Sequence, residues 1–151
     1  MMSNCCINID KDGCVDFYDD RKIITVKDKG NKQTYIGKND SSKNFCKIRI
    51  DDCLIKDGTK CDFLLISKDI KKAFFIELKG SDLLHALKQI ESTINYFKNK
   101  LNNYSLNARI VLNKQRTPDL KSTQLIKFEK MLKKYNGDLK KQSPKLEEVI
   151  S

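Results

Sequence analysis

Two apolar runs near the middle of the chain predict an antiparallel hairpin. The first run begins at Asp62, and the second ends with the triplet Glu77-Leu78-Lys79. Consecutive apolar positions are typical of strands that are covered on both faces, and the short polar linker between the runs is typical of a hairpin connection. Folding the segment symmetrically pairs Ile66 with Ala73 and places Asp62 opposite Glu77.

Apolar side chains at three- and four-residue steps predict two amphipathic helices after the hairpin. The first helix starts at Ser81, a favourable N-cap residue, and continues to about Leu101. The second extends from about Thr123 to Tyr135, and Gly137 follows as its C-terminal stop.

Shorter patterns on both sides of this region predict further strands. Residues 1–40 form an N-terminal β-rich extension of the same domain, and residues 41–138 form the core, with strands at Phe45–Ile50 and Asn107–Leu112. Residues 139–151 have few apolar anchors and are expected to be a basic, flexible tail. The fold class is therefore α/β, with a mixed central sheet flanked by helices. The strands expected in the extension are Ile7–Asp10, Val15–Tyr18, Ile23–Val26 and Gln33–Ile36.

The predicted hairpin brings two carboxylates and an ammonium together. Cβ atoms of opposed strand residues lie roughly 4.5–5.5 Å apart, and like charges there destabilise a sheet unless they are neutralised. Mg²⁺ is a hard cation that binds such oxygen donors and keeps several waters. Because side chains alternate along a strand, Lys79 is expected on the face of Glu77, where it can orient a water. The alternative is structural, with Glu77 and Lys79 as a same-face ion pair.

The chain resembles the PD-(D/E)XK nuclease superfamily, which has the restriction-endonuclease-like fold. The resemblance is carried by Asp62, by the triplet Glu77-Leu78-Lys79 about fifteen positions later, and by a helix directly after the triplet. The resemblance covers roughly residues 45–115. Cys61 stands where the motif name has proline. No glutamate of a first helix can be assigned as an extra metal ligand, and Asp51 or Asp52 is the nearest substitute.

The resemblance implies a metal-dependent nuclease of the restriction-endonuclease-like class. Asp62 and Glu77 would bind Mg²⁺ or Mn²⁺, and Lys79 would position the attacking water. Gln89 joins this catalytic group, because similar proteins often place a glutamine on this helix near the lysine. Members of the superfamily cut DNA or, less often, RNA, and a homodimer would cut both strands. The alternative is a non-catalytic module of the same fold that binds nucleic acid or protein.

The charge of the chain favours a polyanionic partner. The net charge is +10 and the isoelectric point is about 9.3, and phosphate contacts dominate affinity for nucleic acid. A solvated basic surface is the competing interpretation for any single lysine. The candidate nucleic-acid-binding residues lie on the Phe45–Ile50 strand and on the outer faces of the two helices. They are Lys47, Arg49, His85, Lys127, Lys130 and Lys134.

The six cysteines and the single histidine form no zinc-binding pattern, because no two cysteines have the CxxC spacing. Without a secretory signal, the cysteines are expected to be reduced thiols and the protein to be cytoplasmic. No apolar run approaches the roughly 20 residues that span a bilayer, so no membrane segment is expected.

Overall fold

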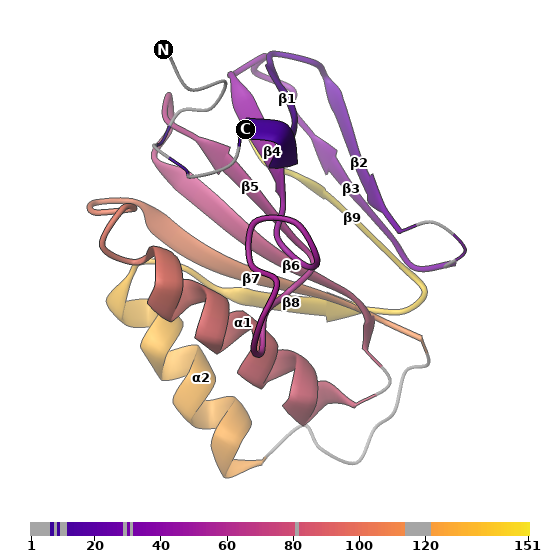
Figure 1. The fold of residues 1–151 in the computed structure, drawn as a ribbon, viewed down its shortest axis with the longest axis vertical. Helices are drawn as coiled ribbons and strands as arrows, with labels where there is room; N and C mark the ends of the chain where they lie inside the picture. The colour runs from indigo at the N-terminus through magenta and orange to yellow at the C-terminus, as the bar shows by residue number, and fades with distance from the viewer. Residues whose placement is uncertain are drawn as a thin grey trace.

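The computed structural model describes Ile7, Ile9, Gly30 and the ranges 12–28, 32–80, 82–113 and 122–151. The side chains of Asp12 and Lys79 lie outside this description. Within the described residues the fold is mixed α/β and richer in strand than in helix (Figure 1). The predicted fold class is confirmed at this level. Ile7–Asp10, expected as a strand, falls partly outside the described residues, and Ile7 and Ile9 are in no strand.

A six-stranded mixed sheet forms the centre of the molecule, in the order β1-β4-β5-β6-β7-β8. The neighbours from β1 to β6 pair antiparallel, whereas β6, β7 and β8 are parallel to one another. The strands are β1 (Val15–Asp19), β4 (Phe45–Arg49), β5 (Phe63–Ser67), β6 (Lys72–Gly80), β7 (Ser105–Leu112) and β8 (Leu139–Gln142).

Different layers cover the two faces of this sheet (Figure 1). Helices α1 (Leu83–Phe97) and α2 (Thr123–Lys134) pack on one face. A second sheet of β2 (Ile23–Lys27), β3 (Thr34–Lys38) and β9 (Lys145–Val149) packs on the other. A short 3₁₀ helix, Asp12–Cys14, precedes β1.

The two-sided covering explains the continuous apolar runs of the hairpin. In β5, Leu64 and Ile66 join the core under the helices, whereas Phe63 and Leu65 join the core between the two sheets. Every residue of β5 is buried, as expected for a strand with no solvated face. The sequence-based interpretation of this run as a central strand is therefore confirmed.

The expected flexible tail at residues 139–151 is wrong. Residues in this range form β8, which extends the central sheet, and β9, which pairs parallel with β3. The physical reason is that three of the few apolar residues find a core: Leu139 packs against the core under the helices, and Leu146 and Ile150 are buried between the sheets. The C-terminal strand β9 therefore completes the second sheet, whose other strands, β2 and β3, belong to the N-terminal extension.

Both predicted helices form, with differences at their ends. Helix α2 matches its predicted range within one residue. Helix α1 ends at Phe97, and its N-cap is Asp82, whose carboxylate accepts the His85 N–H at 3.2 Å; Ser81 lies outside the described residues. After α2, Asn136 takes the left-handed conformation with φ of 57°. Gly137 is instead required by close packing, because a Cβ there would overlap the Leu106 carbonyl.

The prediction of reduced thiols is wrong for three cysteines. Cys14 and Cys53 form a disulfide across 39 positions of sequence, and Cys46 is also disulfide-bonded. Cys61 is the free thiol among the described residues, and it is buried. The cytoplasmic location stays a prediction. No helix in the described part of the chain has the length and apolar character needed to cross a membrane.

Candidate active site at the Asp62–Glu77 strand pair

The two predicted acids flank the last pair of the β5–β6 ladder, Asp62 just before β5 and Glu77 within β6. The predicted pairing of Ile66 with Ala73 is confirmed, and Phe63 pairs with Ile76 at the other end of the ladder. The N–H of Asp62 donates to the Ile76 carbonyl at 3.1 Å, one residue off this register, so the regular ladder ends at the Phe63–Ile76 pair. Asp62 and Glu77 are both buried beside this end, with exposed fractions of 3% and 2%.

Backbone contacts hold Asp62 from both neighbouring strands. Its carboxylate oxygen Oδ2 accepts the N–H of Leu78 at 2.8 Å, so the side chain is tied to β6. Its carbonyl accepts the N–H groups of Ile50 at 2.9 Å and Asp51 at 3.4 Å, which follow β4. Asp62 is therefore a fixed group between two strands and not a mobile loop residue.

The pKa of the Cys61 thiol reflects the charges around this site. Burial raises the pKa of Cys61 far above its ordinary value, and the negative charges of Glu77 and Asp62 raise it further. A hydrogen bond with Thr93 acts in the opposite direction. Burial and the two nearby carboxylates thus both favour the neutral thiol.

Helix α1 closes the site on its other side. The side-chain amide of Gln89 donates to the Lys60 carbonyl at 3.2 Å. The hydroxyl of Thr93 accepts the Cys61 N–H at 2.8 Å. The predicted residue Gln89 is thus brought to the segment that leads into Asp62. Sequence analysis did not single out Thr93, although a hydroxyl at an inward-facing helix position was a usable signal.

The strand carrying the predicted lysine contains a β-bulge. On β7, Val111 pairs with Leu78 and Leu112 pairs with Gly80, so the register shifts at Lys79. A bulge redirects side chains, and bulges are frequent next to active sites. Because of this shift, the alternation of side chains along β6 does not show on which face of the sheet Lys79 lies. The Lys79 side chain itself lies outside the described residues.

The donor set of this pair suits a hard cation. Two carboxylates offer oxygen ligands, and Mg²⁺ commonly completes its shell with waters. Among the described residues, no group of three or more His, Cys, Asp or Glu could hold a metal. Asp51 and Asp52, the suggested third ligands, are exposed, and Asp51 pairs with Lys60 at 3.8 Å. A site here would therefore have Asp62 and Glu77 as its protein ligands, with waters completing the shell.

The predicted nucleic-acid-binding residues fall into two groups. Lys47 and Arg49 both form ion pairs with Asp16 of β1, at 3.3 and 2.9 Å, so their charge is partly balanced within the fold. The remaining candidates are exposed to solvent on the helices. These are His85 on α1 and Lys127, Lys130 and Lys134 on α2.

A second cluster of buried charges joins the two sheets away from this site. Arg109 of β7, 3% exposed, pairs with Glu148 of β9 at 2.6 Å, and Tyr35 of β3 donates to the same carboxylate at 2.7 Å. Sequence analysis missed this cluster. The usable signal was an arginine directly before the apolar end of β7, Ile110-Val111-Leu112.

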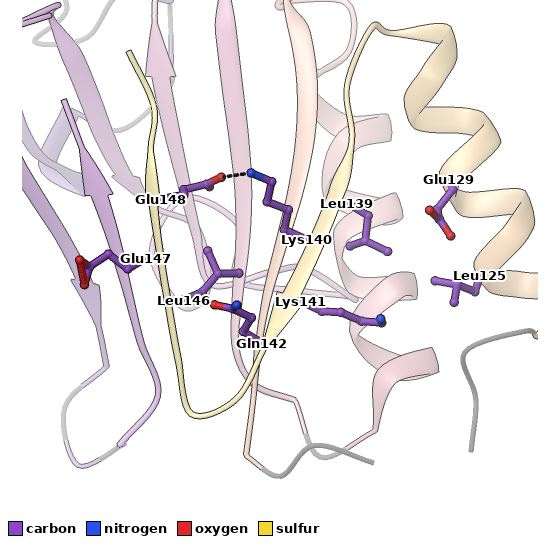
Figure 2. A pocket seen from close by; sticks show the side chains of 9 residues that line it. All are labelled: Leu125, Glu129, Leu139, Lys140, Lys141, Gln142, Leu146, Glu147 and Glu148. Carbon is purple, nitrogen blue, oxygen red and sulfur yellow. Dashed lines mark ion pairs between the residues drawn. The ribbon is translucent and has the colours of Figure 1, made fainter. Parts of the chain in front are cut away.

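A hollow of about 490 Å³ lies beside this cluster, between α2, β8 and β9. Figure 2 shows Lys140 pointing at Glu148, with which it pairs at 3.1 Å, while Glu129 faces the hollow from α2. Acidic and basic groups are mixed along its walls, which does not favour a polyanion.

Comparisons with protein-family models, with curated proteins and with solved structures find no match to this chain.

Proposed function

We propose that this protein is a metal-dependent nuclease that hydrolyses phosphodiester bonds, with DNA as the substrate and internal cleavage as the mode. The observation that carries the proposal is the burial of two acids near one thiol: Asp62 and Glu77 each have 3% or less of their surface exposed, and both charges act on Cys61. Two neighbouring buried acids require a compensating positive charge. A divalent cation supplies that charge and is the usual agent of phosphodiester hydrolysis.

The order of elements around the pair supports the restriction-endonuclease-like core. Strands β4, β5 and β6 form an antiparallel meander, α1 crosses over the sheet, and β7 returns parallel to β6. Both acids then lie where β6 approaches the start of α1. This is the order of strand, strand, strand, helix and strand that the resemblance implies.

The residues of the chain have distinct proposed roles. Asp62 and Glu77 would hold Mg²⁺ or Mn²⁺, which when bound stabilises charge on the phosphate and lowers the pKa of a water. The Leu78 N–H keeps the Asp62 carboxylate in one orientation. Lys79 is proposed to hold and orient the attacking water, and the bulge at its position supports a specialised role.

The proposed nucleic-acid surface is the outer face of α2 together with His85. Lys127, Lys130 and Lys134 are exposed and follow one another at three- and four-residue steps. Lys47 and Arg49 contribute less, because both pair with Asp16. A homodimer with one site on each strand of DNA is part of the same proposal.

The test compares cleavage by the wild-type protein and by three site variants. Plasmid DNA, single-stranded DNA and RNA are incubated with protein in Mg²⁺, Mn²⁺ or EDTA. Wild type is expected to cut plasmid DNA only with metal, and Asp62→Asn, Glu77→Gln and Lys79→Met to cut at least about a hundredfold more slowly. Glu129→Gln, an exposed acid on α2, is the matched control and should retain full activity.

Each contrary result has a definite meaning. Full metal-dependent cleavage by Asp62→Asn and Glu77→Gln would show that these acids are not the active site. Binding of nucleic acid without any metal-dependent product would favour a non-catalytic binding module of this fold.

A further inference from the structure

Two side chains of α1, one turn apart, hold the residues that precede Asp62. Thr93 Oγ1 accepts the backbone N–H of Cys61 at 2.8 Å. Gln89 Nε2 donates to the backbone carbonyl of Lys60 at 3.2 Å. Positions four apart share one face of a helix, so these two bonds form a single contact between α1 and the Lys60–Cys61 segment. We refer to this pair of bonds as the α1 clamp.

Thr93 is well suited to be the rigid half of the clamp. Its hydroxyl donates to the Gln89 carbonyl at 2.8 Å, and the residue is 1% exposed. A hydroxyl has one proton, so donation to Gln89 directs its lone pairs toward other donors, here the Cys61 N–H. Threonine in a helix divides between two rotamers, and the bond to the Gln89 carbonyl selects one of them. The acceptor therefore has one defined direction.

The clamp completes the support of Asp62. Strand β6 holds the Asp62 side chain and N–H, and the residues after β4 hold its carbonyl. Helix α1 holds the peptide between Lys60 and Cys61, because its carbonyl and its N–H are the two groups that Gln89 and Thr93 bind. The clamp therefore fixes the backbone one residue before Asp62 and restricts the position of the Asp62 Cα.

We infer that Thr93 is a positioning residue for Asp62, with Gln89 as its second contact, and that the clamp sets metal affinity at the Asp62–Glu77 pair. This inference rests on the proposed nuclease function. It gives Gln89 a supporting role at the backbone of the site, through its bond to the Lys60 carbonyl. It also gives Thr93, which no motif had marked, a role in activity.

The test compares two substitutions of Thr93 in the full-length protein. Thr93→Val keeps the shape but removes the acceptor, whereas Thr93→Ser keeps the hydroxyl. Ile94→Val, at the next buried position of α1, is a control for general loosening of the helix. Three quantities are measured for each protein: hydrogen exchange of the Cys61 amide, Mn²⁺ affinity by electron paramagnetic resonance, and the rate of metal-dependent DNA cleavage.

In Thr93→Val we expect loss of Cys61 amide protection and a decrease of about tenfold in both Mn²⁺ affinity and cleavage, the usual cost of removing a group that orients a metal ligand. Thr93→Ser should retain all three, and Ile94→Val should retain amide protection and Mn²⁺ affinity. Unchanged protection in Thr93→Val would overturn the clamp. Lost protection with unchanged affinity and cleavage would overturn the positioning role.

Failure of the nuclease proposal gives a different pattern. A wild-type protein that binds no Mn²⁺ and cuts no nucleic acid overturns the proposed function, and with it the role of Thr93 in activity. The Cys61 amide data separate that outcome from failure of the clamp itself, because amide exchange requires neither metal nor substrate.

Discussion

The Asp62 carboxylate accepts the backbone N–H of Leu78 at 2.8 Å, so a side chain at the start of β5 satisfies a backbone donor of β6. Both residues are buried. A buried N–H that loses its acceptor has no water to replace it and costs about 1–3 kcal/mol. Asp62 therefore has a structural role that can be measured apart from any catalytic one.

Substitution of Asp62 should separate these two roles. Asp62→Ala is expected to be about 1–3 kcal/mol less stable than Asp62→Asn, because only asparagine retains an oxygen acceptor for Leu78. Both variants remove the charge, so their difference isolates the hydrogen bond. Urea unfolding gives the free energies, and equal stability of the two variants would contradict the role of this bond. Both should lack cleavage activity.

Gly137 should not tolerate even a methyl group. A Cβ at this position would overlap the Leu106 carbonyl, so β7 and the turn after α2 would have to separate. We expect Gly137→Ala to lower the free energy of unfolding by about 3 kcal/mol, at the upper end of the usual cost of overpacking. Gly13→Ala is the control, since a Cβ there meets nothing within 4 Å. Similar unfolding midpoints for both variants would contradict the close approach.

The ion pair of Glu148 with Arg109 should make stability depend on pH. Burial alone would raise the pKa of Glu148, but hydrogen bonds and charge from Arg109 outweigh it and hold this pKa below its ordinary value of 4.5. A lowered folded-state pKa gives stability that is present above about pH 4.5 and is lost as the pH falls through the folded-state pKa.

Glu148→Gln should therefore be about 3 kcal/mol less stable than wild type at neutral pH, because it leaves a buried guanidinium without this carboxylate. The difference should shrink as the pH falls below 4.5. Unfolding curves at a series of pH values measure it. Glu147→Gln should change stability much less, because the ion pairs of Glu147 with Lys38 and Lys145 are exposed and screened by solvent. A difference for Glu148→Gln that stays constant with pH would contradict the linkage.

The C-terminal strand should contribute to the stability of the whole domain. Leu146 is buried between the sheets, so Leu146→Ala should cost about 2–5 kcal/mol in thermal or urea unfolding. Val149 on the same strand is 58% exposed, and Val149→Ala should change stability by no more than about 0.5 kcal/mol. A flexible tail would make both substitutions neutral.

Local pattern was sufficient for the elements around the candidate site. Continuous apolar runs and a short linker predicted the hairpin and its register, including the pairing of Ile66 with Ala73. The spacing of Leu125, Phe128 and Leu132 predicted α2 within one residue. These features depend on neighbours in sequence, because a tight hairpin and a helix face are set by residues only a few positions apart.

Contacts between distant segments were decided only in the tertiary structure. The pairing of β3 with β9 and the Arg109–Glu148 ion pair join segments far apart in the chain, as does the Cys14–Cys53 disulfide. A local sequence pattern does not specify which distant segments pair with each other, because each segment taken alone could equally be exposed to solvent.

By itself, the sequence determined the hairpin and the pairing of its two apolar strands, because the side-chain period of a strand and the length of the linker leave one register. The tertiary structure decided what surrounds them. It placed Thr93 and Gln89 of α1 against the residues before Asp62 and a bulge at Lys79, because these arrangements depend on how a helix and a neighbouring strand pack against the hairpin.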